Sequence, residues 1–502
     1  MQKASVTGVP RVASPDDTIA RLSGRLLIDG ELRKPIEGRT FALHNPATGK
    51  FLCEVAAADS KDVDVAVRSA ALAQRSWGNL PARERGKRLI AASQTLAAHS
   101  EEVAKLIALE SGKALRTECR PEATNVADVL QFFGGLASEL KGQTVPLRPG
   151  LLSYTQVEPV GVVAAVLPWN VPLMLMAVKI APALIAGNAV VVKSAEETPL
   201  AVMRAAELLS QHLPEGVLNV ISGDGPVCGA ALVRHPEIAK ITFTGSVETG
   251  RLIYRAAADK IVPVTLELGG KSPMIVMPDA DLDKAVDGAV VGMRFTRQGQ
   301  SCTAASRMLV HRGLHDAFVS KLKAKVDQLD IGDPLDERTD IGAIISKAQL
   351  EKILGYIELG RSDPAATAHE CGQLPADEEL RAGNFVRPVI FTGLANSSRL
   401  AREEIFGPVT CVMSFDTLAE AIDLANDSNF GLAASVWTRD LTSALRAVNA
   451  LEAGYIQVNQ AQVAGPNISY GGFKQSGLGK ELTLESMLEH FTRRKSVVIN
   501  FE

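Results

Sequence analysis

The chain has 502 residues and 46% of them are hydrophobic, so it can bury the cores of about three domains of ~150 residues each. Lys and Arg (53) nearly balance Asp and Glu (57), and the formal charge of −4 argues against nucleic acid or an anionic membrane as the main partner. The six cysteines are widely spread without a CxxC pair, which argues against a disulfide framework or a zinc site. This cysteine usage favours a reducing compartment, and we expect a cytoplasmic protein without a bound metal.

The first part of the chain predicts, in order, a polar arm, short strands and a series of helices. Residues 1–22 are polar with two prolines and predict a mobile arm, without the apolar stretch of a secretory signal. Residues 24–55 alternate and turn, which predicts short strands. From Ser60 to about Glu139 the pattern is helical, with Ser60 as the expected N-cap and breaks near residues 99–100 and 111–112.

The most apolar region covers residues 160–192, but prolines, asparagines and a lysine interrupt it, so it is not expected to span a membrane. It predicts instead a buried strand, a helix and a second strand. Further strands and helices alternate up to residue 267, and the strands lack alternating polarity. This pattern indicates a parallel sheet covered on both faces.

A second strand–helix series begins at residues 271–277. We expect helices near 281–297, 314–328, 416–428 and 440–450, and strands near 385–392, 409–415 and 454–459. Residues 143–158 and 493–501 are expected to pair as a small projecting sheet. An exposed sheet edge invites pairing with another subunit, so we expect a homo-oligomer, a dimer or a tetramer.

One cysteine stands out by its surroundings. The stretch FTRQGQSCTAASR, residues 295–307, places Cys302 among small and polar residues. A structural cysteine usually packs among aliphatic side chains, because a free cysteine behaves as a small hydrophobe. Cys302 is therefore a candidate for an accessible nucleophile.

Two further residues have the chemistry to assist such a nucleophile. In LELGGKSP, Glu267 lies between Leu266 and Leu268, and a buried carboxyl there would have a raised pKa and could act as a base. A salt-bridged glutamate at a strand end is the competing interpretation. In PWNVP, the rigid turn could direct the amide of Asn170 to a developing oxyanion, although an asparagine is also an ordinary turn residue.

Two other segments suit a dinucleotide. FTGSVETG, residues 243–250, follows a strand and opens a helix, so Gly245 and Ser246 could hold a pyrophosphate. The GxGxxG fingerprint is absent, and a simple strand–helix turn is the alternative. In KSAEETP, Lys193 and Glu196 could bind ribose hydroxyls, and Glu196 would repel a 2′-phosphate, which favours NAD over NADP. A capped helix start would have the same residues.

Seven segments together carry a family resemblance. PWNVP, GNAVVVKSAEETP, FTGSVETG, LELGGKSP, GQSCTAASR, EEIFGPV and YGGFKQSGLGKE occur in an order and with a spacing that resemble the aldehyde dehydrogenase superfamily, the NAD(P)-dependent, non-acylating enzymes, over residues 24–500. The resemblance implies an α/β fold with a Rossmann-like NAD-binding domain (1–142 and 159–267) and an α/β catalytic domain (268–466). It also implies a small β oligomerisation domain (143–158 and 487–502).

The resemblance assigns the chemistry as well. Cys302 would form a thiohemiacetal and then a thioester, with Asn170 and the Cys302 N–H as the oxyanion hole. Glu267 would activate the hydrolytic water, with Lys179 as a proton-relay partner. Glu404 would hold the nicotinamide ribose and Phe406 would lie at the side of the nicotinamide. The full set of implied NAD-binding residues is Pro168, Trp169, Lys193, Ser194, Glu196, Gly225, Gly245, Ser246, Gly250, Leu268, Glu404 and Phe406.

The implied partner is a small-molecule aldehyde. The residues expected to contact it are Val171, Leu175, Val178, Ser301, Thr303, Ala464 and Tyr470. Many relatives have aromatic residues where this chain has Val171, Val178 and Ala464, while Tyr470 keeps an aromatic ring. We therefore hypothesise a roomier tunnel for a bulky, branched or aromatic aldehyde.

Three alternatives compete with aldehyde oxidation to a carboxylate. A CoA-acylating semialdehyde dehydrogenase would pass the thioester to CoA and would not need Glu267. A binding protein of the same fold would have lost catalysis, which the intact Cys302, Glu267 and Asn170 disfavour. A thiol hydrolase needs a histidine partner, and no histidine lies in a recognisable motif.

Overall fold

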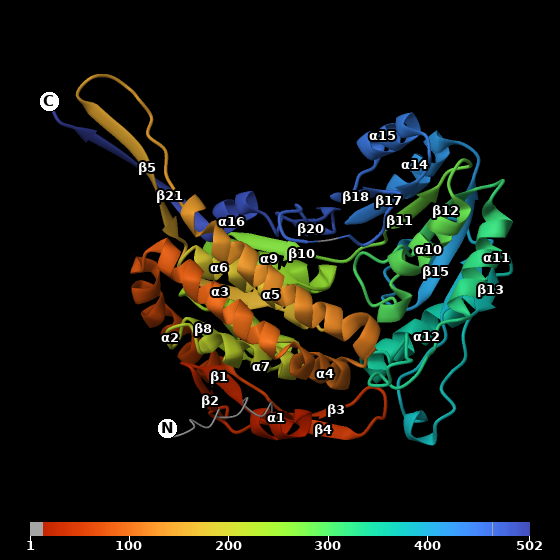
Figure 1. Cartoon of the computed structure of the whole chain (residues 1–502), viewed down its shortest axis with the longest axis horizontal. Coiled ribbons are helices and arrows are strands. Elements are labelled where there is room, and N and C mark those ends of the chain that lie inside the picture. The colour runs from red at the N-terminus through yellow and green to blue at the C-terminus, as the bar shows by residue number, and fades with distance from the viewer. Residues whose placement is uncertain (1–13, 464) are drawn as a thin grey trace, which may run out of the picture.

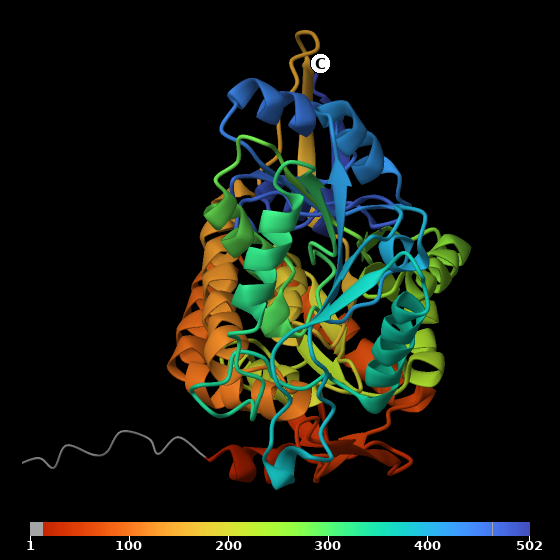
Figure 2. The same cartoon turned by 90° about the vertical axis from the view of Figure 1, so that its right-hand side faces the viewer.

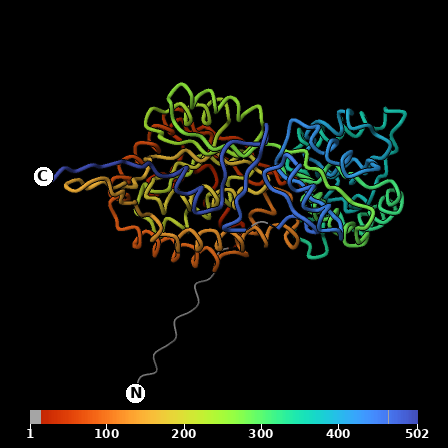
Figure 3. Tube along the Cα trace, turned by 90° about the horizontal axis from the view of Figure 1, so that it is seen from above, coloured from red at the N-terminus to blue at the C-terminus, as the bar shows by residue number. Residues whose placement is uncertain are grey.

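The computed structural model describes residues 14–502 apart from residue 464. Figure 1 shows two lobes, each built on one large sheet, and a long two-stranded hairpin that projects from the first lobe. Seen from above, the hairpin points away from the second lobe (Figure 3). The first lobe holds a sheet built from strands up to residue 267 with one short strand added from residues 477–478, and the second holds a sheet built from strands between residues 273 and 458.

The first sheet has eight strands in the order β2-β1-β8-β7-β6-β9-β10-β20. Its five central strands run parallel and β6 and β7 are buried along their whole length, as their continuous Val and Ala runs predict. The bounds are β1 (Leu26–Ile28), β2 (Glu31–Arg33), β6 (Val162–Val166), β7 (Ala189–Lys193), β8 (Leu218–Ile221), β9 (Ile238–Thr244), β10 (Val264–Glu267) and β20 (Gly477–Leu478).

Helices cover both faces of this sheet. Side chains of α3 to α7 pack on one face, and side chains of α2, α8 and α9 pack mainly on the other, so alternate residues of each strand enter two separate cores. The bounds are α2 (Ser60–Asn79), α3 (Ala82–Ala98), α4 (Ser100–Ser111), η1 (Leu115–Cys119), α5 (Arg120–Gly135), η2 (Leu136–Glu139), α6 (Pro172–Ile185), α7 (Pro199–Ser210), η3 (Gly225–Gly229), α8 (Ala230–Arg234) and α9 (Val247–Lys260).

The second sheet has seven strands in the order β13-β14-β15-β12-β11-β17-β18, all parallel except β13. Figure 2 turns this lobe toward the viewer, with helices on both sides of the strands. The strands are β11 (Pro273–Val276), β12 (Arg307–His311), β13 (Thr367–Glu370), β14 (Val389–Thr392), β15 (Val409–Phe415), β17 (Ala433–Trp437) and β18 (Tyr455–Val458). The helices are α10 (Leu282–Gly292), η4 (Phe295–Arg297), α11 (His315–Val326), α12 (Lys347–Arg361), η5 (Glu378–Leu380), α13 (Arg399–Arg402), α14 (Leu418–Asn426), α15 (Leu441–Ala450) and α16 (Leu484–Phe491), the last of which packs on the first lobe.

Short strands complete the fold. β3 (Thr40–His44) pairs with β4 (Phe51–Ala56), and β16 (Phe430–Gly431) pairs with β19 (Phe473–Lys474). The projecting hairpin consists of β5 (Leu151–Pro159) and β21 (Thr492–Asn500), paired antiparallel in continuous register. This pairing confirms the prediction made from residues 143–158 and 493–501. Exposed apolar side chains along the hairpin include Leu152, Val498 and Ile499.

The structure corrects parts of the sequence analysis. Within the predicted arm, residues 1–13 lie outside the described residues, but Pro15–Leu22 form helix α1, whose Ile19 and Leu22 are buried in the first core. The N-cap of α2 is Asp59, not Ser60, because Asp59 and Asp62 form a reciprocal capping box. The analysis did not predict α12, whose two glycines, Gly355 and Gly360, weaken a helical pattern.

Two searches concern the described residues only, 14–463 and 465–502. Among them, no helix combines the length and the apolar character that crossing a membrane requires. No three His, Cys, Asp or Glu side chains of these residues gather in an arrangement that could hold a metal ion.

Candidate active site

The loop of residues 298–306 lies between η4 and β12, and we call it the nucleophile loop because it carries the predicted nucleophile, Cys302. All six cysteines are free; five are buried, while Cys302 is half-buried. The loop can approach the end of β10 because Gly270 has no side chain: a Cβ there would overlap the carbonyl oxygen of Cys302. Gly299 has φ +64° and lies directly against the backbone of Gly407, so only glycine fits this turn. The loop is thereby held between the two lobes.

The electrostatic surroundings of the Cys302 thiol oppose its ionisation. Burial, with the nearby carboxylates of Glu404 and Glu267, raises the pKa of Cys302 to about 11, while Tyr470 and Arg297 act in the opposite direction. The hydroxyl of Tyr470 is 3.7 Å from the Cys302 Sγ. The resting sulfur is therefore mainly a thiol at neutral pH, and a base is needed to activate it.

Glu267 ends β10 and is only 3% exposed. Neither of its carboxyl oxygens has a hydrogen-bond partner among the described residues, so the salt-bridged interpretation does not hold. Burial and the carboxylate of Glu481 raise its pKa well above the usual value, against the pull of Lys179 and Lys480. A carboxyl of this kind suits a general base, as the sequence analysis proposed.

Lys179 lies on α6 and is fully buried, but its direct partner is not Glu267. Its ammonium donates to the Oε1 of Glu481 at 2.9 Å and to the Thr242 hydroxyl at 3.2 Å. Lys179 therefore acts on Glu267 only through its charge, and its direct partner Glu481 acts on the pKa of Glu267 in the opposite direction.

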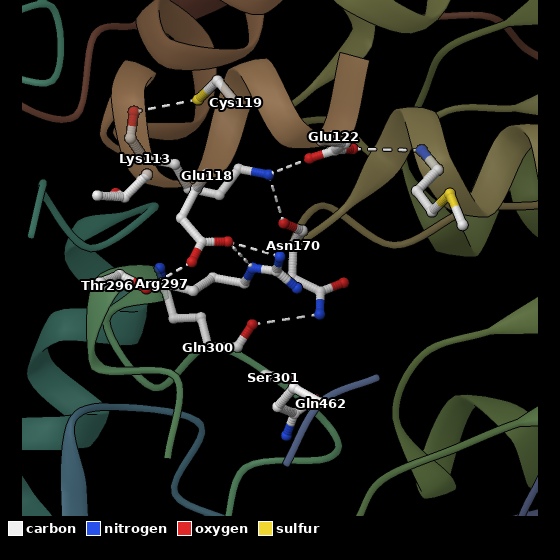
Figure 4. A network of polar contacts seen from close by, with 12 residues as sticks. Lys113, Glu118, Cys119, Glu122, Asn170, Thr296, Arg297, Gln300, Ser301 and Gln462 are labelled. Atoms are coloured by element: carbon white, nitrogen blue, oxygen red, sulfur yellow. Dashed lines mark hydrogen bonds and ion pairs between the residues drawn. The ribbon is translucent and has the colours of Figure 1, made fainter. Parts of the chain in front are cut away.

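Asn170 lies in the loop between β6 and α6 and is 5% exposed. Its side-chain Nδ2 donates to the Gln300 carbonyl at 3.2 Å, and its backbone carbonyl accepts from the Lys113 ammonium at 2.8 Å. Figure 4 shows the Asn170 amide directed at the segment of chain that leads from Gln300 to Ser301. The predicted oxyanion donor is thus adjacent to the nucleophile loop.

A buried ion pair holds the backbone of Asn170 in place (Figure 4). Lys113 and Glu122 pair at 2.5 Å with side chains that are each 2% exposed. The Glu122 Oε1 also accepts the N–H groups of Leu173 at 2.9 Å and Met174 at 3.3 Å, at the start of α6. The N-cap residue of α6 makes no side-chain cap of its own, so Glu122 satisfies these donors instead.

A second buried ion pair supports the other side of the nucleophile loop. Glu118 accepts from Arg297 Nε at 2.7 Å and from the Thr296 hydroxyl at 2.5 Å. Although burial opposes it, Arg297 and Arg294 hold the pKa of Glu118 below its usual value. Lys113, just before η1, thereby holds Asn170, and Glu118 of η1 holds the residues that precede Cys302.

Gln462 holds Thr303, the residue that follows Cys302. Its Nε2 donates to the carbonyls of Gly292 at 3.1 Å and Thr303 at 3.2 Å, and its Oε1 accepts from the Thr303 hydroxyl at 3.0 Å. Ser301 and Thr303 also share a hydrogen bond of 3.1 Å. Two of the predicted substrate residues therefore brace the loop on either side of Cys302.

A cleft of about 740 Å³ opens along the first sheet, at the ends of β6, β7 and β9. Neither Cys302 nor Glu267 contributes to its lining. Ser246 caps α9 by accepting the N–H of Thr249 at 3.1 Å, and Lys193 pairs with Glu196 at 3.1 Å. Seven of the predicted cofactor residues line this cleft: Pro168, Trp169, Lys193, Glu196, Gly225, Gly245 and Ser246.

The remaining predicted cofactor residues lie around this cleft or closer to the nucleophile. Ser194 is fully buried, and Leu268 packs directly against Gly250. Glu404 accepts the N–H of Gly270 at 2.9 Å, beside the nucleophile loop. Phe406 meets Trp169 edge to face at 5.2 Å, which joins the cleft to the region of Glu404.

The remaining predicted substrate residues divide into two groups. Val171 and Leu175 are half-buried at the start of α6, near Asn170 in the chain, whereas Val178 is 4% exposed and belongs to the first core. Tyr470 reaches the Cys302 sulfur. Ala464 lies outside the described residues, so its predicted place in the tunnel is not described.

The sequence analysis missed several residues that position the site: Lys113, Glu118, Glu122, Arg297, Gln462 and Glu481. A usable signal existed for the first three. They stand in a helical region that mixes charged with apolar residues, and a charged side chain there must find a partner before it can be buried. Lys113 and Glu122 are partners only nine residues apart, whereas Glu118 pairs with Arg297 from a distant segment, a contact that only the folded chain reveals.

Comparison with known proteins agrees with this geometry. Residues 34–497 match the model of the aldehyde dehydrogenase family. A betaine aldehyde dehydrogenase from Mesorhizobium japonicum is 41% identical over 474 residues, which cover 94% of this chain and 96% of the relative.

Solved structures match as well. The NAD⁺ complex of an aldehyde dehydrogenase from Bacillus cereus is 37% identical, with TM-score 0.93 over 98% of this chain and 99% of that one. A betaine aldehyde dehydrogenase from Staphylococcus aureus in complex with NAD⁺ is 35% identical, with TM-score 0.93 over 97% of this chain and 96% of the other. These matches confirm the predicted fold class and the resemblance carried by the seven segments. The chain belongs to the aldehyde dehydrogenase family.

Proposed function

We propose that this aldehyde dehydrogenase oxidises an aldehyde to a carboxylate with NAD, with Cys302 as nucleophile and Glu267 as base. The observation that carries the proposal is the combination of a half-buried thiol with a buried carboxyl whose oxygens have no partner among the described residues. The first group can form a covalent intermediate, and the second can take a proton.

The first half of the reaction forms a carbon–sulfur bond. The Glu267 carboxylate takes the proton of the Cys302 thiol, and the resulting thiolate attacks the aldehyde carbon. The new oxyanion accepts hydrogen bonds from the Asn170 Nδ2 and the Cys302 N–H. For this, Asn170 must exchange its hydrogen bond with Gln300 for one with the oxyanion. The Lys113–Glu122 pair holds the Asn170 backbone while the amide changes partner.

The cofactor supplies the hydride acceptor. The cleft fits an extended dinucleotide: it has a helix N-terminus at Ser246 for a pyrophosphate and Glu196 for ribose hydroxyls. Lys193, Trp169 and Phe406 would hold the rest of the dinucleotide, and Glu404 the nicotinamide ribose. The charge of Glu196 disfavours a 2′-phosphate, so NAD is the proposed cofactor in preference to NADP.

The second half of the reaction removes the acyl group from Cys302. Glu267 takes a proton from water, the resulting hydroxide attacks the thioester, and Cys302 leaves as a thiolate. The Lys179–Glu481 pair, joined by a direct hydrogen bond, is the proposed next part of the proton relay. Glu267 makes no hydrogen bond to either side chain, so a water molecule would carry the proton from Glu267 to this pair. A CoA-acylating enzyme would not need this base, so the buried Glu267 carboxyl favours hydrolysis.

Two candidate substrates follow from different observations. Val171 and Leu175 offer branched aliphatic surfaces at the start of α6, which favours a bulky neutral aldehyde. Betaine aldehyde is the second candidate, because the Mesorhizobium relative bears that name. A quaternary ammonium is usually held by several aromatic faces.

We further propose the organisation of the enzyme. Residues up to 142 and 159–267 form the dinucleotide-binding domain, residues 268–466 the catalytic domain, and 143–158 with 487–502 the oligomerisation strands. The exposed apolar side chains on β5 and β21 support assembly into a dimer or tetramer through this hairpin. A cytoplasmic location suits a nucleophile that must remain a free thiol.

The experiment is a screen for NADH formation over a panel of aldehydes that includes betaine aldehyde and a chain-length series, with NAD and NADP in parallel. We expect oxidation with NAD, no dependence on added CoA, and no turnover by Cys302→Ala. Turnover by that variant would contradict the role of Cys302. A clear preference for acetaldehyde would contradict a roomy tunnel.

A further inference from the structure

Tyr470 makes a contact that its assignment as a substrate residue does not explain. Its hydroxyl is 3.7 Å from the Cys302 Sγ, within hydrogen-bond range for sulfur. Among the described residues, the Tyr470 hydroxyl makes no hydrogen bond with any other side chain. The residue therefore points its polar end at the reacting atom.

The backbone and ring of Tyr470 are held in place around this contact. Its N–H donates to the Glu481 carbonyl at 3.2 Å, and its carbonyl accepts from the Glu481 N–H at 2.7 Å. The ring packs at 5.9 Å from the ring of Tyr455. The next residue, Gly471, lies against Glu267, where a Cβ would come within 2.7 Å of the carboxyl. The hydroxyl of Tyr470 thus lies beside the nucleophile, and the backbone of the next residue lies against the base.

We propose that the Tyr470 hydroxyl donates a hydrogen bond to the Cys302 sulfur and stabilises its thiolate, which makes Tyr470 a catalytic residue. The inference rests on the proposed function, because it assigns a role in the same reaction. A hydrogen bond to an ionised acceptor is stronger than one to the neutral form, so the contact favours the thiolate over the thiol.

The other charged groups around the sulfur show why such a donor is needed. Glu267 and Glu404 face it with carboxylates and oppose a second negative charge, while Arg297 and Arg294 favour the thiolate from a distance. Tyr470 adds a direct donor without a net charge. The pKa of Tyr470 is itself raised well above 10 by burial and then by Cys302, Glu267 and Glu481, so the hydroxyl keeps its proton over the pH range of catalysis. Tyr470 is a donor and not a base.

The hydrogen bond serves two steps without transferring a proton. It stabilises the sulfur before attack, and it stabilises the same sulfur as the leaving group when the thioester is hydrolysed. Asn170 acts on the substrate oxygen instead, so the two donors act on different atoms of one intermediate. Both hydrogen bonds are local and do not depend on the chemical nature of the aldehyde side chain.

The test is the pH dependence of Cys302 alkylation by iodoacetamide in the full-length enzyme, with the label mapped by mass spectrometry. Tyr470→Phe removes only the hydroxyl, and we expect the apparent pKa of Cys302 to rise by about one unit, which slows alkylation at neutral pH about tenfold. Tyr455→Phe is the matched control, because it removes a hydroxyl from the adjacent ring, and we expect no change. Thermal unfolding midpoints of both variants verify that they are folded.

An unchanged thiol pKa in Tyr470→Phe would overturn the proposal, as would an equal shift in Tyr455→Phe. A change in the plateau rate with an unchanged pKa would also overturn it, because that result reports access and not thiolate stability. Failure of the proposed function is a separate observation: it would appear as aldehyde turnover by Cys302→Ala. The two failures are therefore distinguishable.

Discussion

Replacing Lys113 with methionine tests whether the buried ion pair positions the oxyanion donor. The side chains of Lys113 and Glu122 are each 2% exposed, so the substitution leaves the Glu122 charge buried without its partner. Such a loss costs about 3–5 kcal/mol, and the Asn170 carbonyl loses its donor at the same time. We expect a marked fall in the thermal inactivation midpoint of Lys113→Met.

The same substitution should lower activity selectively. Removing one oxyanion donor costs about 10²–10³ in kcat, and a loosened Asn170 should lose part of that stabilisation. Lys113 does not line the cleft of the first sheet, so the KM for NAD should be unchanged. Steady-state kinetics with NAD and aldehyde varied in turn separate these effects.

The double variant Lys113→Met with Glu122→Gln is the decisive comparison. The introduced glutamine side chain would be neutral, and its carbonyl could still accept the N–H groups of Leu173 and Met174. We expect the double variant to recover much of the lost stability, since no buried charge remains in the pair. Lys105→Met is the control, because Lys105 forms only an exposed pair with Glu101 at 3.7 Å, worth at most about 1 kcal/mol. A double variant as unstable as the single one would refute the reasoning.

Three further expectations concern the base, the cofactor and the hairpin. Glu267→Gln should give a burst of NADH followed by slow turnover, because hydrolysis of the thioester lacks its base. In the wild type, hydrolysis should slow as the pH falls through the raised pKa of Glu267, because the base becomes protonated. Stopped-flow absorbance measures both the burst and the pH dependence. Glu196→Ser should improve kcat/KM with NADP, since the repelling carboxylate is gone, and unchanged NADP kinetics would count against the role of Glu196. Val498→Lys, at a side chain 58% exposed on β21, should lower the mass in sedimentation analysis, and an unaltered mass would exclude this face of the hairpin as the interface.

Features marked by residues that are adjacent in the chain could be predicted from the sequence, whereas contacts between distant segments could not. Cys302, Glu267 and Asn170 could be selected as candidates because small residues, glycines or prolines adjacent in the chain mark each position. The sheet order could not be inferred from the same local patterns. β20 returns from residue 477 to pair with β10, and no local pattern connects segments so far apart.

The buried charged residues Glu118 and Glu481 could not be predicted either, because each depends on a partner far away in the chain. Glu118 is stabilised by Arg297, and Glu481 by Lys179, over separations that exceed any helical or strand period. Burial of each group is tolerated only once its partner is present. The capping error at α2 has a smaller origin: Asp59 and Ser60 are both good caps, and the reciprocal contact with Asp62 decides between them.

The late position of Tyr470 has a consequence for the newly made protein. Tyr470 follows Cys302 by 168 residues, which the ribosome adds in roughly 10–30 s. During that interval the sulfur lacks both the proposed hydrogen bond from Tyr470 and the full burial that raises its pKa to about 11 in the finished enzyme. Burial outweighs the hydrogen bond in setting this pKa, so a stalled or truncated chain would expose a more acidic thiol and would be the form most prone to irreversible sulfur damage.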